Sequence, residues 1–501
     1  MTSLRAWRPV PKWITLGVVI GAVSGGMAIA FYGSVEWCTR WLLGALGGFH
    51  PATIAASPGG FHPASGFTRM WAIPLLAAAG ALIAALLVSR VAQEAEGHGT
   101  DAAIRAINTN PAGIRLRALP VKMIASAITI GSGGSGGSEG PTAQMAATSA
   151  SFIARALGLD HDEARTAVTA GLAAGVGAIF RAPVGGALLG VEILFRKDRE
   201  WAMLIPSLIA SGVAYVEFSG VYGWTPMFGH VPGMRITAFA QLLIFPLLGL
   251  ICGGLARLYA VTFYGVERLF RRWRKWRPLR IGVAGLATGA LGLFVPGVLG
   301  TGYGTIQDVL SPQRVLHLSL LVLVAMPLAK ILGTSLSIGS GGSGGVFGPG
   351  MVVGATAGAA LWRLSEMAGA HAVVPASPAL LAAVGMAACL GAAARSPIAI
   401  TVIAAETCRS GWVLATALLA VPVAVKLMGS DTLYSEQLLN RKELRKSRKE
   451  QAGRTAEPVP ASRTAAASIT LAQDASFPGA GLPRDPGLPQ NAAMPDTHGV
   501  A

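Results

Sequence analysis

Apolar runs with few or no charged residues recur along most of the chain, from about residue 13 to residue 428. The segments 13–33, 70–88 and 241–261 are each about 20 residues long, the length that a helix needs to cross the hydrocarbon core of a bilayer. The pattern therefore predicts an all-α integral membrane protein with several membrane-spanning helices.

Other apolar segments are shorter, or are interrupted by glycine and proline. They lie at 121–130, 203–213, 351–361 and 380–394. Short, interrupted segments are typical of transporters whose helices end part-way through the membrane. Irregular backbone at that depth is tolerated only where protein or a water-filled cavity covers it. We therefore expect partly spanning helices beside the full spans.

The pattern divides the chain into three parts. Residues 1–14 form an amino-terminal segment, and residues 15–440 form the membrane domain. Residues 441–450 include eight charged residues, and residues 451–501 are rich in Ala, Pro, Ser and Gly without periodicity. We predict that 441–501 is a basic juxtamembrane segment followed by a disordered cytoplasmic tail.

Composition agrees with a membrane protein. Only 13% of the residues are charged and 52% are hydrophobic, with a mean hydropathy of +0.55, whereas soluble proteins carry about 25% charged residues. A soluble protein of this length would have to bury nearly all of its surface, so that class is excluded.

The net charge of +16 gathers beside the apolar runs. Lys and Arg lie at 5–12, at 268–280 and at 441–449, as expected for residues that set membrane orientation. We therefore predict a multi-pass protein of the cell (inner) membrane, in contact with lipid and not with nucleic acid, with both termini cytoplasmic. The same rule places 268–280 in the cytoplasm, but inverted halves place it outside, and the sequence leaves this open.

Cysteine spacing gives no sign of a metal or disulfide framework. The four cysteines lie far apart, each within apolar sequence, as small core residues do. We expect no metal ion and no other cofactor. The cysteines are Cys38, Cys252, Cys389 and Cys408.

The chain contains an internal repeat. Residues 122–137 recur as 330–345, and the glycine-rich heptapeptide 131–137 is identical to 339–345. Such a repeat predicts two related halves, at about 15–265 and 281–440, although the sequence alone does not show whether they are inverted. A second motif is also repeated at one spacing: Gly171, Arg181, Pro183 and Glu192 match Gly385, Arg395, Pro397 and Glu406.

The repeated glycine loops have the composition of an anion site. Apolar sequence flanks both, which disfavours a flexible linker, and each is followed by a proline, Pro141 or Pro349, that favours a helix start. Glycine lets backbone N–H groups face a ligand, and the positive end of a helix dipole favours an anion. Two such ends together would hold an anion weakly enough to release it, as conduction requires.

Glu139 lies within the first loop, just before Pro141. A carboxylate at membrane depth is costly and is a functional candidate. Its charged form resembles the transported anion and can take the anion's place, and protonation would free the site. We predict that Glu139 is a gate, the alternative being a helix-capping acid.

At these motifs the sequence resembles the CLC family of chloride channels and proton–chloride exchangers, in its bacterial form without CBS domains, over about residues 15–440. Three segments and a late tyrosine carry the resemblance. The family's Gly-Ser-Gly-Ile-Pro, Gly-Arg-Glu-Gly-Pro and Gly-x-Phe-x-Pro segments resemble Gly97-His98-Gly99-Thr100-Asp101, Gly137-Ser138-Glu139-Gly140-Pro141 and Gly345-Val346-Phe347-Gly348-Pro349, and the pore tyrosine falls at Tyr434.

The resemblance implies a bundle of tilted, partly spanning helices in two inverted repeats, and a homodimer with one pore in each subunit. It implies transport of chloride or a similar small anion rather than an enzyme, with Glu139 as the gating residue. The residues it places around the anion are His98, Gly99, Val346, Phe347, Gly348 and Tyr434, and the pore loops contribute Gly97, Gly137, Ser138, Gly140, Pro141, Gly345 and Pro349.

Three positions depart from the family pattern. His98, an anion contact or a structural histidine, stands where the family has a serine, and Ser138 stands where it has an arginine. Ile193 occupies the place of the exchangers' inner proton glutamate, and isoleucine carries no proton. The adjacent Glu192 is a structural residue or a displaced proton relay, turned about 100° away on a helix. Ile193 favours channel-like, uncoupled conduction; the alternative is a proton-coupled chloride antiporter.

Several further readings stay open. An intramembrane serine protease that uses a loop serine is a remote alternative, and it would need a histidine such as His98 as its base. Arg181 and Arg395 are either a helix-terminus pair or residues that attract anions. Asp101 is expected to cap a helix.

Overall fold

Helices form nearly all the regular structure of the computed structural model, which describes residues 10–272 and 277–446. Within those ranges no strand occurs, only isolated bridges. One compact unit ends at Leu444, and a second begins at Arg445. The all-α prediction is confirmed; the tail from residue 447 on, predicted to be disordered, lies outside the described residues.

The first half contains eight α-helices in the described residues. They are α1 (Val10–Thr39), α2 (Ala72–Val91), α3 (Thr100–Thr109), α4 (Ala118–Gly131), α5 (Glu139–Ala156), α6 (His161–Phe180), α7 (Pro183–Glu192) and α8 (Leu204–Tyr222). The second half contains α9 (Ile244–Arg271), α10 (Arg277–Phe294), α11 (Tyr303–Val309), α12 (Pro312–His317), α13 (Leu320–Thr334), α14 (Phe347–Met367), α15 (Pro378–Ala393), α16 (Pro397–Cys408) and α17 (Gly411–Met428).

Six helical segments of the described chain are long and apolar enough to cross a membrane. Shorter apolar helices, among them α4, α15 and α16, lie beside them, in agreement with the prediction of partial spans. The six candidate spans are Pro11–Leu46, Ala72–Val91, Trp201–Tyr222, Phe239–Arg271, Leu320–Gly339 and Gly411–Met428.

Two segments predicted to be short belong to longer helices. The segment 203–213 continues in α8 for 19 residues, up to Gly223, whose φ of 88° ends the helix. The segment 351–361 lies within the 21-residue α14. Its Gly354 and Gly358 do not break the helix, because they allow close contact with main-chain atoms of α15.

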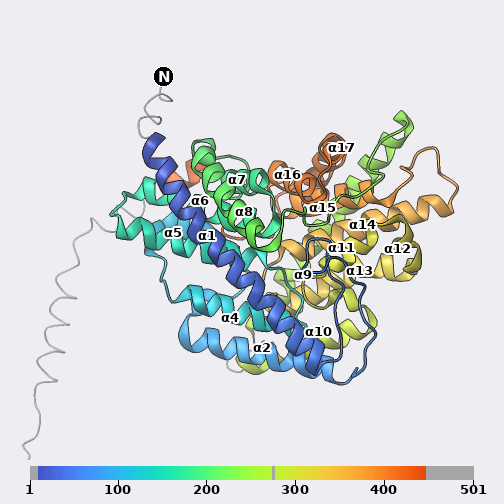
Figure 1. Cartoon of the computed structure of the whole chain (residues 1–501), viewed down its shortest axis with the longest axis horizontal. Coiled ribbons are helices and arrows are strands. Elements are labelled where there is room, and N and C mark those ends of the chain that lie inside the picture. The colour runs from blue at the N-terminus through green and yellow to red at the C-terminus, as the bar shows by residue number, and fades with distance from the viewer. Residues whose placement is uncertain (1–9, 273–276, 447–501) are drawn as a thin grey trace, which may run out of the picture. The chain divides into compact units, whose positions relative to one another are not determined.

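Helix packing repeats between the halves (Figure 1). In the first half α5 packs on α6 and α1 on α8, and in the second half α14 packs on α15 and α9 on α17. Across the halves, α2 meets its counterpart α10 and α7 meets α16. Self-complementary contacts of this kind result from a two-fold relation, so the two inverted repeats are present.

Two glutamates make this relation visible at atomic level. Oε2 of Glu192, the last residue of α7, accepts a hydrogen bond of 2.8 Å from the main-chain N–H of Ala399 at the start of α16. Oε2 of Glu406 in α16 accepts one of 2.8 Å from Gly185 at the start of α7. Each acid thus satisfies an N–H at the positive end of the other helix.

The two repeated arginines lie at helix ends. Arg181 caps α6 and Arg395 follows α15, both with a left-handed φ of 54°. The Arg181 guanidinium is buried and donates to carbonyls of two loops, to Thr225 at 2.6 Å and to Ala56 at 2.9 Å. Arg181 therefore has the contacts of a helix-terminus residue.

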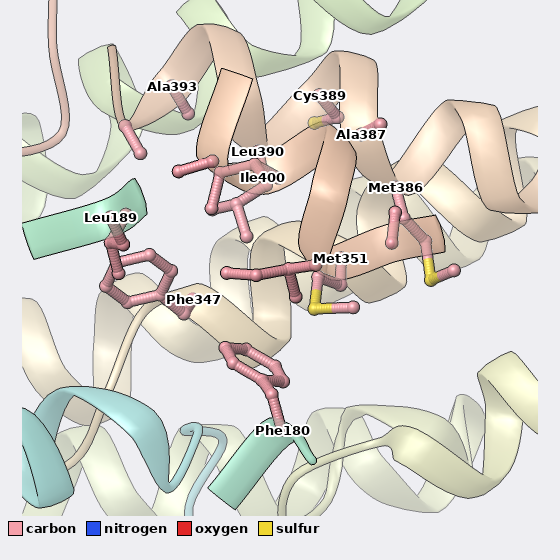
Figure 2. Packing of buried hydrophobic residues seen from close by; sticks show 14 of the residues in the cluster. Phe180, Leu189, Phe347, Met351, Met386, Ala387, Cys389, Leu390, Ala393 and Ile400 are labelled. Atoms are coloured by element: carbon pink, nitrogen blue, oxygen red, sulfur yellow. The ribbon is translucent and has the colours of Figure 1, made fainter. Parts of the chain in front are cut away.

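A large apolar core lies at the start of α14 (Figure 2). It joins side chains from both halves, so water is excluded from one side of the helix end. The core there includes Phe180, Leu189, Phe347, Met351, Leu390 and Ile400, all at most 1% exposed.

Candidate functional site

The two repeated glycine loops are in direct contact. The main-chain N–H of Gly137 donates to the carbonyl of Gly345 at 2.7 Å, and the N–H of Gly345 donates to the carbonyl of Gly137 at 2.7 Å. This antiparallel bridge brings together the starts of α5 and α14. Each helix start has N–H groups without intrahelical partners and the positive end of a dipole, which makes their junction suitable for an anion.

Glu139 is the first residue of α5 and is fully buried. Its Oε2 accepts a hydrogen bond from the main-chain N–H of Gly348 at 3.3 Å, and its Oε1 accepts one from the Ser138 hydroxyl at 3.1 Å. The Glu139 carboxylate therefore reaches from the first glycine loop to the amino-terminal end of α14. A free anion attracted by those amides would compete for the same position.

The loop that carries His98 joins the second glycine loop. The Gly97 N–H donates to the carbonyl of Gly342 at 2.9 Å, and the Gly344 N–H donates to the carbonyl of Gly97 at 3.3 Å. Gly99 has a φ of 83° and has the main chain of Gly140 close to its Cα, so a side chain there would be strained and would clash.

Tyr434 is fully buried and contacts two of the three segments. Its ring centroid is 5.3 Å from that of His98 and 5.4 Å from that of Phe347. Its hydroxyl, Nδ1 of His98 and Oγ1 of Thr100 are buried without a hydrogen-bond partner in the described residues. Unpaired buried polar atoms cost about 1–3 kcal/mol each, and a small ion that accepts hydrogen bonds would satisfy the two hydroxyls.

Two cavities, which share no lining residue, reach toward this junction. The His98 vestibule has a volume of about 710 Å³ and is lined by the His98 loop and the residues that follow α2. The Ser138 vestibule has a volume of about 660 Å³ and is lined by Ser138 and by residues 49–54, which precede α2.

Because α2 has 20 residues, its ends lie about 30 Å apart, so the vestibules lie at opposite ends of a membrane-spanning helix. Glu139 and Tyr434 line neither of them. The junction is therefore closed toward both vestibules.

Sequence reasoning did not assign two buried lysines. Nζ of Lys122 donates to the carbonyls of Ala95 at 3.1 Å and Gly97 at 2.6 Å, and so supports the His98 loop. Lys330 makes equivalent contacts to its own half, for example to Gly300 at 3.0 Å. Each lysine is the first residue of its copy of the repeated segment, and this matching position was the signal that could have identified both.

Asp101 does not cap its helix as expected. The N-cap of α3 is Gly99 and has no side-chain cap. The carboxylate of Asp101 turns instead to Nε2 of His98, 3.3 Å away, and to Ser435, whose hydroxyl donates to it at 2.7 Å. It thus ties the His98 loop to the segment that carries Tyr434.

Glu192 and Ile193 take no part in these contacts. Oε1 of Glu192 lies 3.0 Å from the Arg199 guanidinium, while its Oε2 caps α16. Ile193 is fully buried, and its carbonyl accepts a hydrogen bond from the Gln437 amide at 2.9 Å.

Residues 80–429 match the family described as voltage gated chloride channel. The chain belongs to this family, the CLC proteins. It is 30% identical over 397 residues to a putative chloride channel protein ClcB-like of Ralstonia nicotianae, covering 77% of this chain and 86% of that protein. It is 28% identical over 437 residues to the H(+)/Cl(-) exchange transporter ClcA of Vibrio campbellii, covering 85% and 88%.

Two solved CLC structures have the same fold. A slow cyanobacterial Cl-/H+ antiporter superposes with a TM-score of 0.72 at 21% identity, over 87% of this chain and 99% of that one. A CLC-type fluoride/proton antiporter superposes with a TM-score of 0.70 at 20% identity, over 86% and 99%. With the family match, they identify the chain as a CLC-type anion transport protein of the membrane.

Proposed function

We propose that this CLC protein exchanges chloride for protons and that Glu139 is its gate. The observation that carries the proposal is the position of the Glu139 carboxylate, which occupies the amide end of α14 between two separate vestibules. The exchange reading replaces channel-like conduction as the first choice, because several relatives of matching length are named proton–chloride exchangers.

The exchange step follows from competition for the α14 amides. A charged Glu139 accepts the Gly348 N–H and excludes chloride by charge and by volume. A protonated Glu139 no longer competes as an anion, so chloride takes the amides and the acid group turns away with its proton. Because Ser138, the preceding residue, lines the Ser138 vestibule, that vestibule is where the proton leaves.

The remaining site residues surround the ion. We assign the anion contacts to the backbone of Gly99, Val346, Phe347 and Gly348 and to the side chains of His98 and Tyr434. The loops that shape the pore comprise Gly97, Gly137, Ser138, Gly140, Pro141, Gly345 and Pro349.

Reconstitution tests the proposal. Purified protein in liposomes with a chloride gradient is expected to move chloride outward and protons inward in a fixed ratio, even against a proton gradient. Chloride efflux that is unaffected by a protonophore and accompanied by no proton movement would replace exchange with uncoupled conduction. Absence of any anion flux would remove the transport proposal altogether.

Uncoupled conduction is the second candidate, and Ile193 favours it. No proton can pass through an isoleucine, and the neighbouring Glu192 is held by Arg199 and by α16. We propose a structural role for Glu192. If protons are exchanged, they then reach Glu139 by another route.

Assembly and orientation are part of the same proposal. The protein is expected to be a homodimer of the cell (inner) membrane with both termini cytoplasmic. Cross-linking of purified protein checks the dimer, and reporter fusions at each terminus check the orientation, with a reporter active only outside the cytoplasm as the contradicting result.

A further inference from the structure

The two ring nitrogens of His98 have different surroundings. Nε2 lies 3.3 Å from Oδ2 of Asp101, whereas Nδ1 is buried without a hydrogen-bond partner in the described part of the chain. The His98 side chain is only 7% exposed and lines the inner end of the His98 vestibule. A ligand atom is therefore expected at Nδ1.

Asp101 determines which nitrogen carries the proton of the neutral ring. Its Oδ2 accepts hydrogen bonds from the N–H and hydroxyl of Ser435, at 3.1 and 2.7 Å, and its Oδ1 accepts one from the Glu436 N–H at 3.3 Å. These donors favour an ionised carboxylate, which only accepts hydrogen bonds. A neutral His98 beside it keeps its proton on Nε2, and Nδ1 presents a lone pair.

A lone pair at Nδ1 repels an anion, while the imidazolium ion has an N–H at both nitrogens. We infer that the His98–Asp101 pair forms a chloride site that binds a chloride ion and a proton together. A hydronium ion in the vestibule gives its proton to Nδ1 and leaves as water, and the new N–H donates to chloride. This inference rests on the proposed chloride transport.

Proton and chloride then strengthen each other's binding by the same factor, as linkage requires. Chloride at this site offsets the charge of the imidazolium, and Tyr434, with its unpartnered hydroxyl and its ring 5.3 Å away, closes the site on the inner side. The site responds to acid in the His98 vestibule independently of Glu139, which lines neither vestibule.

Other charged groups around His98 come from several elements. Lys122 of α4 lies beneath the loop, and Tyr264 of α9 lines the vestibule. Two ion pairs, Arg105–Glu436 at 2.6 Å and Arg271–Glu267 at 2.5 Å, lie at its rim, and Glu94, Glu96, Arg115 and Arg280 complete the lining.

With Asp101, which also lines the vestibule, the acidic and basic lining groups number five and four. Among the side-chain types present, only imidazole ordinarily changes its charge between about pH 5 and pH 8. His98 is the one histidine among the described residues that line the vestibule, so we assign proton-linked binding there to it. The buried ammonium of Lys122 contacts the same loop, and loss of the pH dependence in the His98 variants distinguishes the two groups.

Chloride binding to the full-length Glu139→Gln protein tests the inference, because this variant removes titration of the gate. Isothermal titration in detergent is expected to give about tenfold tighter binding at pH 5 than at pH 8. Near neutral pH, two buffers of different ionisation enthalpy should report net proton uptake with each chloride. His371→Gln, which changes an exposed histidine, is the matched control and should leave both results as they are.

Two double variants, Glu139→Gln/His98→Gln and Glu139→Gln/His98→Ser, should lose the pH dependence of chloride binding and the proton uptake. Asp101→Asn should weaken both effects, because the neutral His98 ring can then carry its proton on Nδ1 instead of Nε2. Equal pH dependence with and without His98, or a flat profile in Glu139→Gln alone, would overturn this inference and leave chloride transport standing. No chloride binding at any pH would overturn the proposed function itself. Each variant is first checked for a native size-exclusion profile.

Discussion

The short helices α3 and α11 occupy equivalent places in the two halves and share one backbone design. Each follows a Gly-x-Gly turn whose two glycines have positive φ, and a buried lysine donates hydrogen bonds to carbonyls of each turn. The glycines are Gly97 (74°), Gly99 (83°), Gly300 (61°) and Gly302 (77°), and the lysines are Lys122 and Lys330.

Their side chains differ completely. The α3 turn carries His98, whose ring faces Asp101 and Tyr434, while the α11 turn carries Thr301 in the same place. The two turns thus share one backbone arrangement, but only the α3 turn carries an imidazole side chain. The glycine loops show the same asymmetry, because Glu139 in the first loop corresponds to Phe347 in the second.

The largest expected effect comes from removing the acid that distinguishes the glycine loops. Glu139→Gln should make chloride flux faster, and the proton flux per chloride should fall about tenfold or more, a change of about 1.4 kcal/mol in coupling. The glutamine side chain is uncharged, so it competes poorly with chloride for the main-chain N–H groups at the start of α14, and it has no acid proton to exchange. Paired chloride-electrode and pH recordings from liposomes measure both.

Glu366→Gln, which removes a carboxylate near the end of α14 where it pairs with exposed His371, is the matched control and should keep normal coupling. Coupling that persists in Glu139→Gln would remove Glu139 from its assigned role.

The lysine pair tests whether the two turns are also equal in energy. Lys122→Met removes the ammonium donor from the carbonyls of Ala95 and Gly97, which keep only the Ser343 hydroxyl and the Gly344 N–H. Lys330→Met removes it from the carbonyls of Gly297, Val298 and Gly300. A hydrogen bond from a charged donor contributes about 1.5–3 kcal/mol, and its loss is partly offset because a buried ammonium is no longer desolvated. Each variant should lose about 3 kcal/mol of unfolding free energy.

Denaturation in detergent measures that loss, with exposed Lys426→Met as control. Only Lys122→Met should also weaken chloride binding, because its turn carries His98. Equal chloride affinity in the two variants would show that the turns do not differ in function.

The sequence predicted the parts of this site that lie in the repeat. Two identical glycine loops and their prolines indicated converging helix starts, and Glu139 stood out as an acid in apolar sequence. The contacts of Asp101 with Ser435, and of Glu192 with α16, join residues far apart in the chain. No local pattern specifies such partners, so a capping role for Asp101 was the natural but wrong expectation.

Helix length was misjudged for a related reason. The glycines of α14 read as interruptions in the sequence, but they permit contact with α15. Whether a glycine breaks a helix or lets another helix approach depends on the neighbour, which the sequence of one segment does not contain.

The reciprocal glutamate caps should behave alike if both are structural. Glu192→Gln and Glu406→Gln each weaken charge-assisted hydrogen bonds to the opposite helix start, and each should cost about 2 kcal/mol of unfolding free energy. The ratio of protons to chloride in liposomes should stay unchanged in both. A collapse of that ratio in Glu192→Gln alone would instead identify Glu192 as the displaced proton relay.

The smallest expected effect compares the acids of α3 and α11, helices that are not among the candidate spans. Burial raises the pKa of Asp101, but the charge and hydrogen bond of His98 and the donors of residues 435 and 436 outweigh it, and the net shift is downward. Burial raises the pKa of Asp308 from 3.8 to about 6, and Arg314, 3.4 Å away, only partly opposes this.

The signs of the two contributions are therefore opposite. A lowered pKa means that Asp101 stabilises the fold above its usual range and loses that contribution as the pH falls through its folded pKa. The raised pKa of Asp308 means that its stabilisation is complete below pH 3.8 and is lost as the pH rises through about 6. At pH 8, Asp101→Asn should lower the unfolding free energy by about 1 kcal/mol, and Asp308→Asn should raise it by a similar amount. Unfolding measured at pH 4 and pH 8 separates the two contributions, because the increase in unfolding free energy from Asp308→Asn should vanish at pH 4. An increase of equal size at both pH values would show that Asp308 is not the group that titrates.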